Sequence, residues 1–268
     1  MLLSILSIAA ACKSKDGLPA SATSSPHRFF DEVRFQNGLD DSESYTEPVF
    51  ASAAERAFQR AVPEGVVIQK AAVTGILEPD GDQMQLSLAL QLSVRGSSRP
   101  VETSLFAVAG LHRPAREVAE KGLSDLSRAG RDLLGLLVAP PDRLTAALSS
   151  AELDVQVLAA RLIGERHLSD PKTAAALCRM LTDPRDEAAE AAAESLKAVG
   201  TPAIVPLIIR SVQRGNLRSE VRAIEVMGRI GGPEAEAYLE MTAMGHEIPE
   251  VRSLSRSLLK TMRETAAR

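Results

Sequence analysis

The chain has 268 residues, of which 45% are apolar and 25% charged, with a formal net charge of −4. This length and composition predict a globular chain with about two domains rather than a disordered one. The 6 Phe, 2 Tyr and no Trp leave few of the stacking surfaces on which sugar binders and single-strand nucleic-acid binders depend. The acidic balance and the lack of a Lys and Arg block also argue against nucleic acid as a partner.

The two cysteines, Cys12 and Cys178, lie far apart in the sequence. They form neither a CxxC pair nor a dense disulfide framework, which excludes zinc ribbons and redox dithiols. We therefore expect no metal and no cofactor.

A short apolar segment opens the chain and ends at a cysteine. Residues 2–11 are LLSILSIAAA, and the polar run KSKDG follows Cys12. A helix that spans a bilayer needs roughly 20 apolar residues, so this segment has the length of the apolar part of a signal peptide. Ala9-Ala10-Ala11-Cys12 resembles the lipobox of bacterial lipoproteins. The alternatives are a plain cleaved signal, or a soluble protein whose first residues happen to be apolar.

The lipobox resemblance implies cleavage before Cys12 and acylation of its thiol and its new amine. Acyl chains contribute about 0.8 kcal/mol per buried CH₂ and would hold the protein on a membrane. Because Lys13 follows the cysteine, the resemblance further implies the outer membrane of a bacterial envelope, with the folded part in the periplasm. Residues 1–11 are thus the expected signal peptide, and residues 12–49, rich in polar and turn-forming residues, the expected flexible tether.

Residues 50–140 are predicted to form a small α/β domain that begins with a helix and a strand. The helix over 51–62 has its alanines and Phe58 on one stripe. The β-branched stretch 66–77 is typical of a strand, and the cluster at 79–82 of a hairpin turn. Asp80 and Asp82 in that turn lack the further ligands of an EF-hand, so no calcium site is expected.

The alternation of apolar and polar residues over 84–94 indicates a strand with one buried face, typical of an antiparallel sheet. A third strand is expected near 101–109 and a long helix from Pro114 to the Pro140-Pro141 pair. The predicted order is α-β-β-β-α, with both helices on one face of the sheet. His112, in the loop between, has no carboxylate partner in sequence and is interpreted as solvated.

From Pro141 onward the sequence repeats with a period of 31–33 residues. Four ungapped segments align, at 154–165, 187–198, 218–229 and 250–261. Their sixth position is small (Ala159, Ala192, Ala223, Ser255) and their tenth is large and apolar (Ile163, Leu196, Met227, Leu259). Prolines at 171, 202 and 233 recur between the segments and predict the start of a second helix in each unit.

This pattern resembles HEAT repeats of the short, phycobilisome-lyase type, most closely at Glu187 to Gly200 and at Glu250-Val251-Arg252. The resemblance implies that residues 141–268 form antiparallel helix pairs that are stable only when stacked. The predicted fold class is an α+β N-terminal module followed by an all-α solenoid of HEAT-like helix pairs. Since unrelated proteins share such repeats, the resemblance says more about fold than about function.

The second helices are expected to line the concave surface of the solenoid and to bind a protein partner there. Their charged residues change from basic to acidic along the stack and form the predicted partner-binding set: Lys172, Arg179, Arg210, Arg214, Glu236 and Glu240. The alternative is a charged face that is only solvated. Cys178 is interpreted as a core residue, and His167 and His246 as helix-end residues rather than metal ligands.

Together these features predict a membrane-anchored, non-catalytic scaffold or adaptor of the bacterial envelope that binds a protein and no nucleic acid. In an alternative, the α/β domain is an envelope sensor that faces a ligand or peptidoglycan. A chromophore lyase is the third hypothesis. Only the repeat supports it, and a secreted lipoprotein would not meet cytosolic phycobiliproteins.

Overall fold

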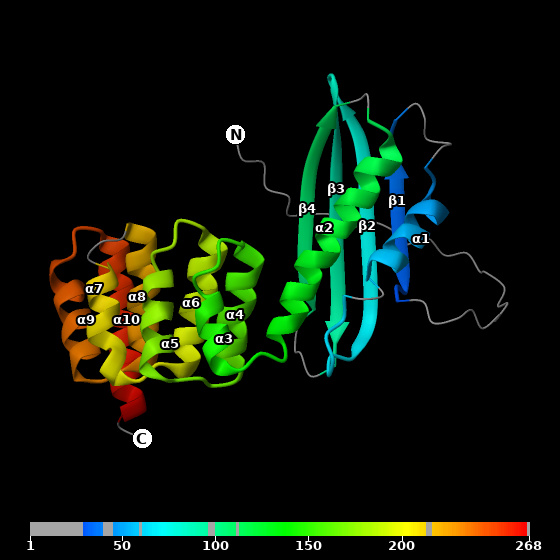
Figure 1. The fold of residues 1–268 in the computed structure, drawn as a ribbon. Helices are drawn as coiled ribbons and strands as arrows, with labels where there is room; N and C mark the ends of the chain where they lie inside the picture. The colour runs from blue at the N-terminus through cyan, green and yellow to red at the C-terminus, as the bar shows by residue number, and fades with distance from the viewer. Residues whose placement is uncertain are drawn as a thin grey trace, which may run out of the picture.

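The computed structural model describes residues 29–39, 45–58, 61–95, 100–110, 113–212 and 216–266. Within these ranges the chain forms a four-stranded sheet unit followed by a stack of helices (Figure 1). The expected signal peptide, Cys12, His112 and Arg214 lie outside the described residues, as does most of the expected tether.

The sheet has the strand order β1-β2-β3-β4. Strand β2 (Ile68–Asp80) forms an antiparallel hairpin with β3 (Gln83–Val94), and β4 (Val101–Gly110) continues the sheet antiparallel to β3. Gly81 closes the hairpin turn with a φ of 62°, a conformation that glycine adopts without strain. The prediction from alternation is confirmed, because the six apolar side chains from Met84 to Val94 are all buried.

Strand β1 (Glu32–Asn37) is an element that the sequence did not predict, and it corrects part of the expected tether. It pairs parallel to β2. The backbone N–H groups of Phe29 and Phe30, just before it, donate to the Glu55 carboxylate at 2.8 and 3.0 Å. Phe35 stacks on Phe50 with 4.4 Å between ring centroids. Contacts distant in sequence hold this edge strand. Its own sequence alternates only briefly, with Val33 and Phe35 between polar residues, inside a segment rich in polar and turn-forming residues.

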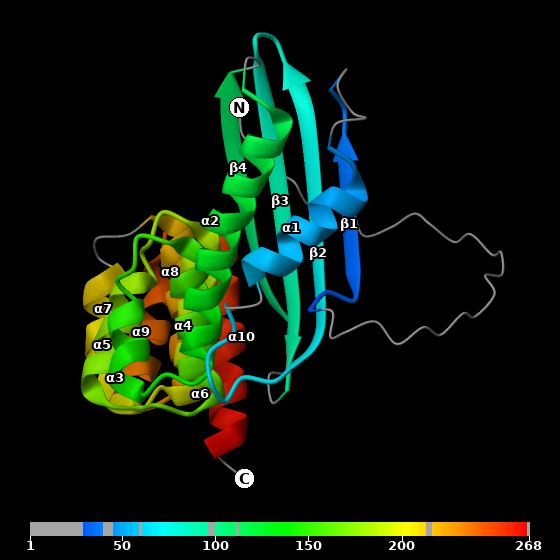
Figure 2. The same cartoon turned by 45° about the vertical axis from the view of Figure 1, so that its right-hand side comes forward.

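Helices α1 (Glu47–Phe58) and α2 (Ala115–Leu136) cover one face of the sheet (Figure 2). Both were predicted, although α1 begins and ends about four residues earlier than expected. Gly122 lets α2 approach the sheet closely: a Cβ there would lie 2.5 Å from Cδ2 of Leu86. The observed order is therefore β-α-β-β-β-α, with the second face of the sheet left open.

The helical stack consists of two rows. The first row is α4 (Leu153–Glu165), α6 (Asp186–Val199), α8 (Leu217–Ile230) and α10 (Pro249–Ala266). The second row is α3 (Pro141–Ala147), α5 (Pro171–Met180), α7 (Val205–Val212), preceded by the short 3₁₀ helix η1 (Pro202–Ile204), and α9 (Pro233–Gly245).

The repeat register predicted from the sequence is confirmed by burial. All four residues at the small sixth position are fully buried, and the four large residues at the tenth position are buried as well. Pro171, Pro202 and Pro233 each stand at the first turn of a helix, as predicted. Neighbouring first-row helices contact each other more extensively than second-row helices do. The first row is thus the tightly packed side of the stack.

The sheet unit and the helical stack are joined by shared contacts. Leu137, Val155 and Leu158 pack against the cores of both. The Thr103 hydroxyl on β4 donates to the Asp154 carboxylate at the start of α4, with 2.5 Å between the oxygens. Arg166, after α4, donates to the Ala139 carbonyl in the linker at 2.7 Å. These contacts hold the first helices of the stack to the sheet unit.

Candidate functional site

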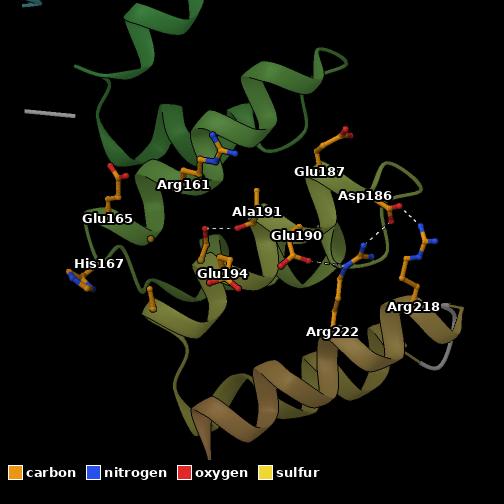
Figure 3. Close-up of a pocket in the computed structure, with 13 residues that line it drawn as sticks. Arg161, Glu165, His167, Asp186, Glu187, Glu190, Ala191, Glu194, Arg218 and Arg222 are labelled. Atoms are coloured by element: carbon orange, nitrogen blue, oxygen red, sulfur yellow. Dashed lines mark hydrogen bonds and ion pairs between the residues drawn. The ribbon is translucent and has the colours of Figure 1, made fainter. Parts of the chain in front are cut away.

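A hollow of about 720 Å³ lies on the first row, across α4, α6 and α8 (Figure 3). Small residues leave the space for it, among them Gly164, Ala191 and Ala198. Charged side chains surround these small residues. The hollow is open to solvent, so it suits an extended surface contact better than a small enclosed ligand.

The acidic side of the hollow comes from α6. Asp186, Glu190 and Glu194 recur every four residues and therefore lie along one stripe of the helix. The alanines between them, at 188, 189, 192 and 193, are buried in the core. One helix thus supplies both the close packing of the stack and the carboxylates of its hollow.

Two arginines of α8 hold these carboxylates in place. Arg222 donates to Asp186 Oδ1 at 2.8 Å and to Glu190 Oε2 at 3.3 Å, and its side chain is only 13% exposed. Arg218 also pairs with Asp186. The hydrogen bond from Arg222 is the main cause that lowers the pKa of Asp186 below its ordinary value. The Asp186 carboxylate therefore stays ionised at neutral pH, and the arginines fix its direction and that of Glu190.

The charges around the hollow are unequal in number. Five carboxylates, of Glu165, Asp186, Glu187, Glu190 and Glu194, face three guanidinium groups, of Arg161, Arg218 and Arg222. In the part of the chain that the structure describes, the exposed side chains of Glu187 and Arg161 form no hydrogen bond or ion pair. Lys197, which does not line the hollow, pairs with Glu194 at 2.8 Å and reduces the acidic excess. The exposed Glu187 is thus the side chain that favours a positively charged ligand surface.

The predicted partner-binding residues lie on the second row and do not line this hollow. Lys172 and Arg179 are on α5, Arg210 is on α7, and Glu236 and Glu240 are on α9. Arg263 of α10 pairs with Glu236 at 2.7 Å and also with Glu240, so both carboxylates already have a partner within the chain. Whether this set binds a protein stays a prediction.

The expectation that the second helices line the concave surface of the solenoid stays a prediction, whereas the hollow described above lies on the first row. The small sixth position brings the first-row helices close together. A sequence signal for the site existed and was missed. Asp186 and Arg218, and likewise Glu190 and Arg222, are one repeat of 32 residues apart. Opposite charges at equivalent positions of successive units predict ion pairs between them.

The remaining singled-out residues have local roles. Cys178 is buried in the core, and burial raises the pKa of its thiol to about 11, as befits an unreactive cysteine. His167, with a φ of 52°, ends α4. His246 follows α9, and its Nδ1 accepts the Ile248 N–H at 3.1 Å. Both histidines thus lie at helix ends. No group of three potential metal ligands occurs among the described residues.

A second, polar hollow of about 580 Å³ lies on the open face of the sheet, next to the junction. Arg34, Gln91 and Glu102 line it together with Asp154 of α4. Gln91 donates to Glu102 at 2.7 Å. This surface therefore has contact with both the sheet unit and the helical stack.

Comparison with known families identifies the helical part. Residues 141–223 match the family model of HEAT repeats. The match runs from α3 into α8 and includes most of the residues that surround the first-row hollow. No curated protein matches the chain. The chain thus consists of a four-stranded sheet module followed by a HEAT-like solenoid, and HEAT repeats generally mediate contacts between proteins.

Proposed function

We propose that the protein is a membrane-anchored, non-catalytic scaffold whose first-row hollow binds a basic segment of a protein partner. The observation that carries this proposal is the acid-rich hollow across three HEAT-like helices. Helices spaced about 8–10 Å apart give it a length of roughly 20 Å. A helical segment of about 13 residues would cover that length.

The fixed carboxylates suit such a partner for a physical reason. Arg222 and Arg218 hold Asp186 and Glu190 in direction, so a ligand does not have to order them on binding. Glu187 remains exposed at the edge of the hollow to meet an incoming cation. Charge complementarity then sets orientation and association rate, while apolar stems of the ligand contact the small residues of the hollow.

Site-specific photo-crosslinking in bacterial cells distinguishes the two rows. We expect a crosslinker in place of Glu187 to form an adduct with a partner, because that side chain borders the hollow. The matched position is Arg210, on the second row. Adducts at 210 alone would move the binding surface to the second row, and adducts at neither position would contradict the scaffold proposal.

Charge reversal tests the electrostatic part of the proposal on the captured partner. Glu187→Lys should slow association severalfold at low salt, and the difference should shrink as the Debye length falls below about 8 Å. Lys172→Glu on the second row is the control and should leave the rate unchanged. Equal effects of the two variants would show that only the overall charge of the protein matters.

The anchor in this proposal depends on residues 2–12, outside the described part of the chain. Among the described residues, no helix has the length and apolarity needed to cross a bilayer. Acylation at Cys12, with the folded part in the periplasm at the outer membrane, is proposed from the sequence. Cys12→Ser should abolish incorporation of labelled palmitate and release a folded protein from membranes. Equal labelling of both proteins would contradict the anchor.

An envelope sensor is the second candidate, and the polar hollow at the junction is the observation that favours it. A ligand there would touch β4 and α4 together through Glu102 and Asp154. Soluble peptidoglycan fragments, titrated onto the folded protein, should then shift the amide resonances of both elements. Resonances that do not move at millimolar fragment would rule out this ligand class.

A further inference from the structure

Strand β4 leaves half of its outer edge free. It is the last strand in the sheet order, so among the described residues one side of its backbone has no neighbouring strand. The start of β4 is covered by α4, where Thr103 is 8% exposed and bonded to Asp154. Residues 105–110 extend beyond that contact, away from the helical stack (Figure 1). Such an edge presents unpaired N–H and C=O groups to any approaching strand.

On both faces of the sheet, this free edge has a surface that an added strand could contact. Towards the helices, a groove of about 540 Å³ lies between residues 105–110 and one face of α2. On the open face of the sheet, Phe106 and Val108 are 62% and 49% exposed. Since side chains of a strand alternate between faces, a strand added here would fill the groove with one set of side chains and cover Phe106 and Val108 with the other.

The face of α2 that lines the groove has a charge pattern that complements itself. Arg113, before the helix, and Glu117, Lys121 and Asp125 recur every four residues with alternating sign, and all four line the groove. In two antiparallel copies of this stripe, Arg113 faces Asp125 and Glu117 faces Lys121, with residue 119 at the centre. Within one chain, Arg113 pairs with Glu117 at 3.4 Å and Arg128 with Asp125 at 3.3 Å, and the Arg113 and Glu117 side chains remain more than half exposed. Among the described residues, Lys121 has no ion-pair partner.

The exposed apolar residues Phe106 and Val108 also complement themselves when two copies of the strand pair antiparallel. In antiparallel pairing, residues directly opposite each other lie on the same face of the sheet. If Ala107 faces Ala107 of a second copy, Phe106 faces Val108 twice. An aromatic residue opposite a β-branched residue is a favourable cross-strand pair.

The two centres lie at nearly the same height along the sheet. Strand β4 ends and helix α2 begins at the connection near 110–114, and both extend from it to the same side in space. Residue 107 is three residues from the end of β4, about 10 Å. Residue 119 is four residues beyond Ala115, where α2 begins, about 6 Å along the helix, so the two centres lie within a few ångströms of the same height. A single two-fold axis can therefore pass through both centres, which is the condition for an isologous interface.

We propose that the protein forms a two-fold symmetric dimer in which residues 105–109 of β4 pair antiparallel with the same residues of a second copy. The two sheets join into one, and the two α2 stripes face each other across the joined grooves. The first-row hollow lies on the helical stack, away from this edge, so both copies keep it open. The dimer thus presents two scaffold surfaces to partners.

Sedimentation velocity of the full chain carrying Cys12→Ser tests the dimer. We expect a dimer at tens of micromolar. Val108→Lys with Phe106→Lys should give a monomer, because charged residues block strand addition. Gln36→Lys, on the exposed face of the opposite edge strand β1, is the matched control and should stay dimeric. A monomeric parent protein at 100 µM would overturn the proposal, as would a dimer that the paired lysines leave intact.

Charge exchange tests the α2 stripes independently of folding. Lys121→Glu should raise the dimer dissociation constant about tenfold at low salt, since it places like charges opposite each other twice. Adding Glu117→Lys restores opposite charges and should return the constant to within about threefold of the parent. Failure of the second change to rescue the first would show that the stripes do not meet.

Cysteine pairing tests the register. Phe106→Cys and Val108→Cys copies, each with Cys12→Ser, should crosslink efficiently when mixed and oxidised, because opposite residues lie within the Cα distance of a disulfide. Each variant alone should crosslink poorly. Equal yields in all mixtures would overturn the register. Hydrogen exchange of the β4 amides gives a further outcome. If these amides become protected only after another protein is added, the strand that pairs with β4 belongs to that protein and not to a second copy of this chain.

Discussion

The sheet unit and the helical stack bury different kinds of side chain in their cores. All 6 Phe residues of the chain lie in the sheet unit, and five of them make ring contacts in two groups, Phe29 with Phe30 and Phe58, and Phe35 with Phe50. The helical stack has no Phe and buries alanines in the contacts between its first-row helices. Large side chains join segments distant in sequence, whereas small side chains allow a short unit to be stacked repeatedly. The sheet unit should therefore tolerate local crowding better than the stack.

Ala192→Leu should have the largest effect and break the close packing of the stack. The Ala192 side chain is fully buried on α6, and a leucine there forces the neighbouring first-row helices apart. We expect a loss of about 3 kcal/mol of unfolding free energy, at the upper end for overpacked cores. Urea unfolding followed by far-UV circular dichroism measures it. Ala198→Leu, exposed on the same helix, is the control, and equal losses in both variants would contradict the repeat register.

Gly122→Ala probes the same kind of crowding in the sheet unit, where flexible leucine ends can move. The new Cβ would lie 2.5 Å from Leu86 Cδ2 and 3.0 Å from Leu88 Cδ1. We expect a loss of about 1–2 kcal/mol, after the gain in helix propensity. Gly135→Ala in the same helix meets only Arg143 Nη2, at 3.8 Å, and should stabilise the protein by about 0.5 kcal/mol. If both Gly122→Ala and Gly135→Ala stabilise the protein, the close approach of α2 to the sheet at Gly122 does not require a glycine.

Thr103→Val tests how far the two regions unfold together. It removes the hydrogen bond to Asp154 and leaves that carboxylate without the hydroxyl. We expect a loss of about 1 kcal/mol and a separation of two unfolding curves. One curve follows the Phe bands in the near ultraviolet, which report the sheet unit because the stack has no Phe, and the other follows the far ultraviolet. Ser104→Ala, exposed on the same strand, should keep the two curves together. Unchanged coincidence in Thr103→Val would show that the junction does not depend on this bond.

The smallest expected effect is the pH dependence at Asp170, the N-cap of α5. Its side chain accepts the Thr173 N–H at 3.0 Å, and hydrogen bonding to Thr173 lowers the pKa of this carboxyl below its ordinary value. A lowered pKa in the folded state means that the stabilisation is present above pH 4 and is lost as the pH falls below it. Asp170→Asn keeps an acceptor and should flatten the dependence between pH 4 and 2. A parallel acid profile for both proteins would contradict this assignment.

The sequence revealed those features whose period matches the structure. The alternation over 84–94 marked β3, and the small residues at Ala159, Ala192 and Ala223 marked the contacts between units, because regular burial imposes a regular pattern. Strand β1 was not predicted because its alternation, with Val33 and Phe35 between polar residues, is short and stands in a segment otherwise rich in polar and turn-forming residues. The contact of Phe35 with Phe50 is distant in sequence, and no local pattern encodes it.

The hollow on the first row was not predicted from the sequence for a related reason. The sequence shows which residues face the core, but a surface hollow depends on how closely the helices of one row are spaced. That spacing is set by how closely Ala192 lets α6 approach its neighbours, a sum over many contacts. The pairing of Glu190 with Arg222 one repeat later was readable in principle. It needed the observed packing to be recognised as part of a hollow.

The two ends of the helical stack limit how the chain can change its length during evolution. Val155 and Leu158 bury the near side of α4 against the sheet unit, and α10 turns exposed polar residues such as Arg256 and Lys260 outward at the far end. A unit added at either end would separate these covering surfaces from the repeats they protect. A duplication between α6 and α8 would leave both ends untouched and lengthen the hollow by one helix. Gene duplication can thus extend the scaffold only from within.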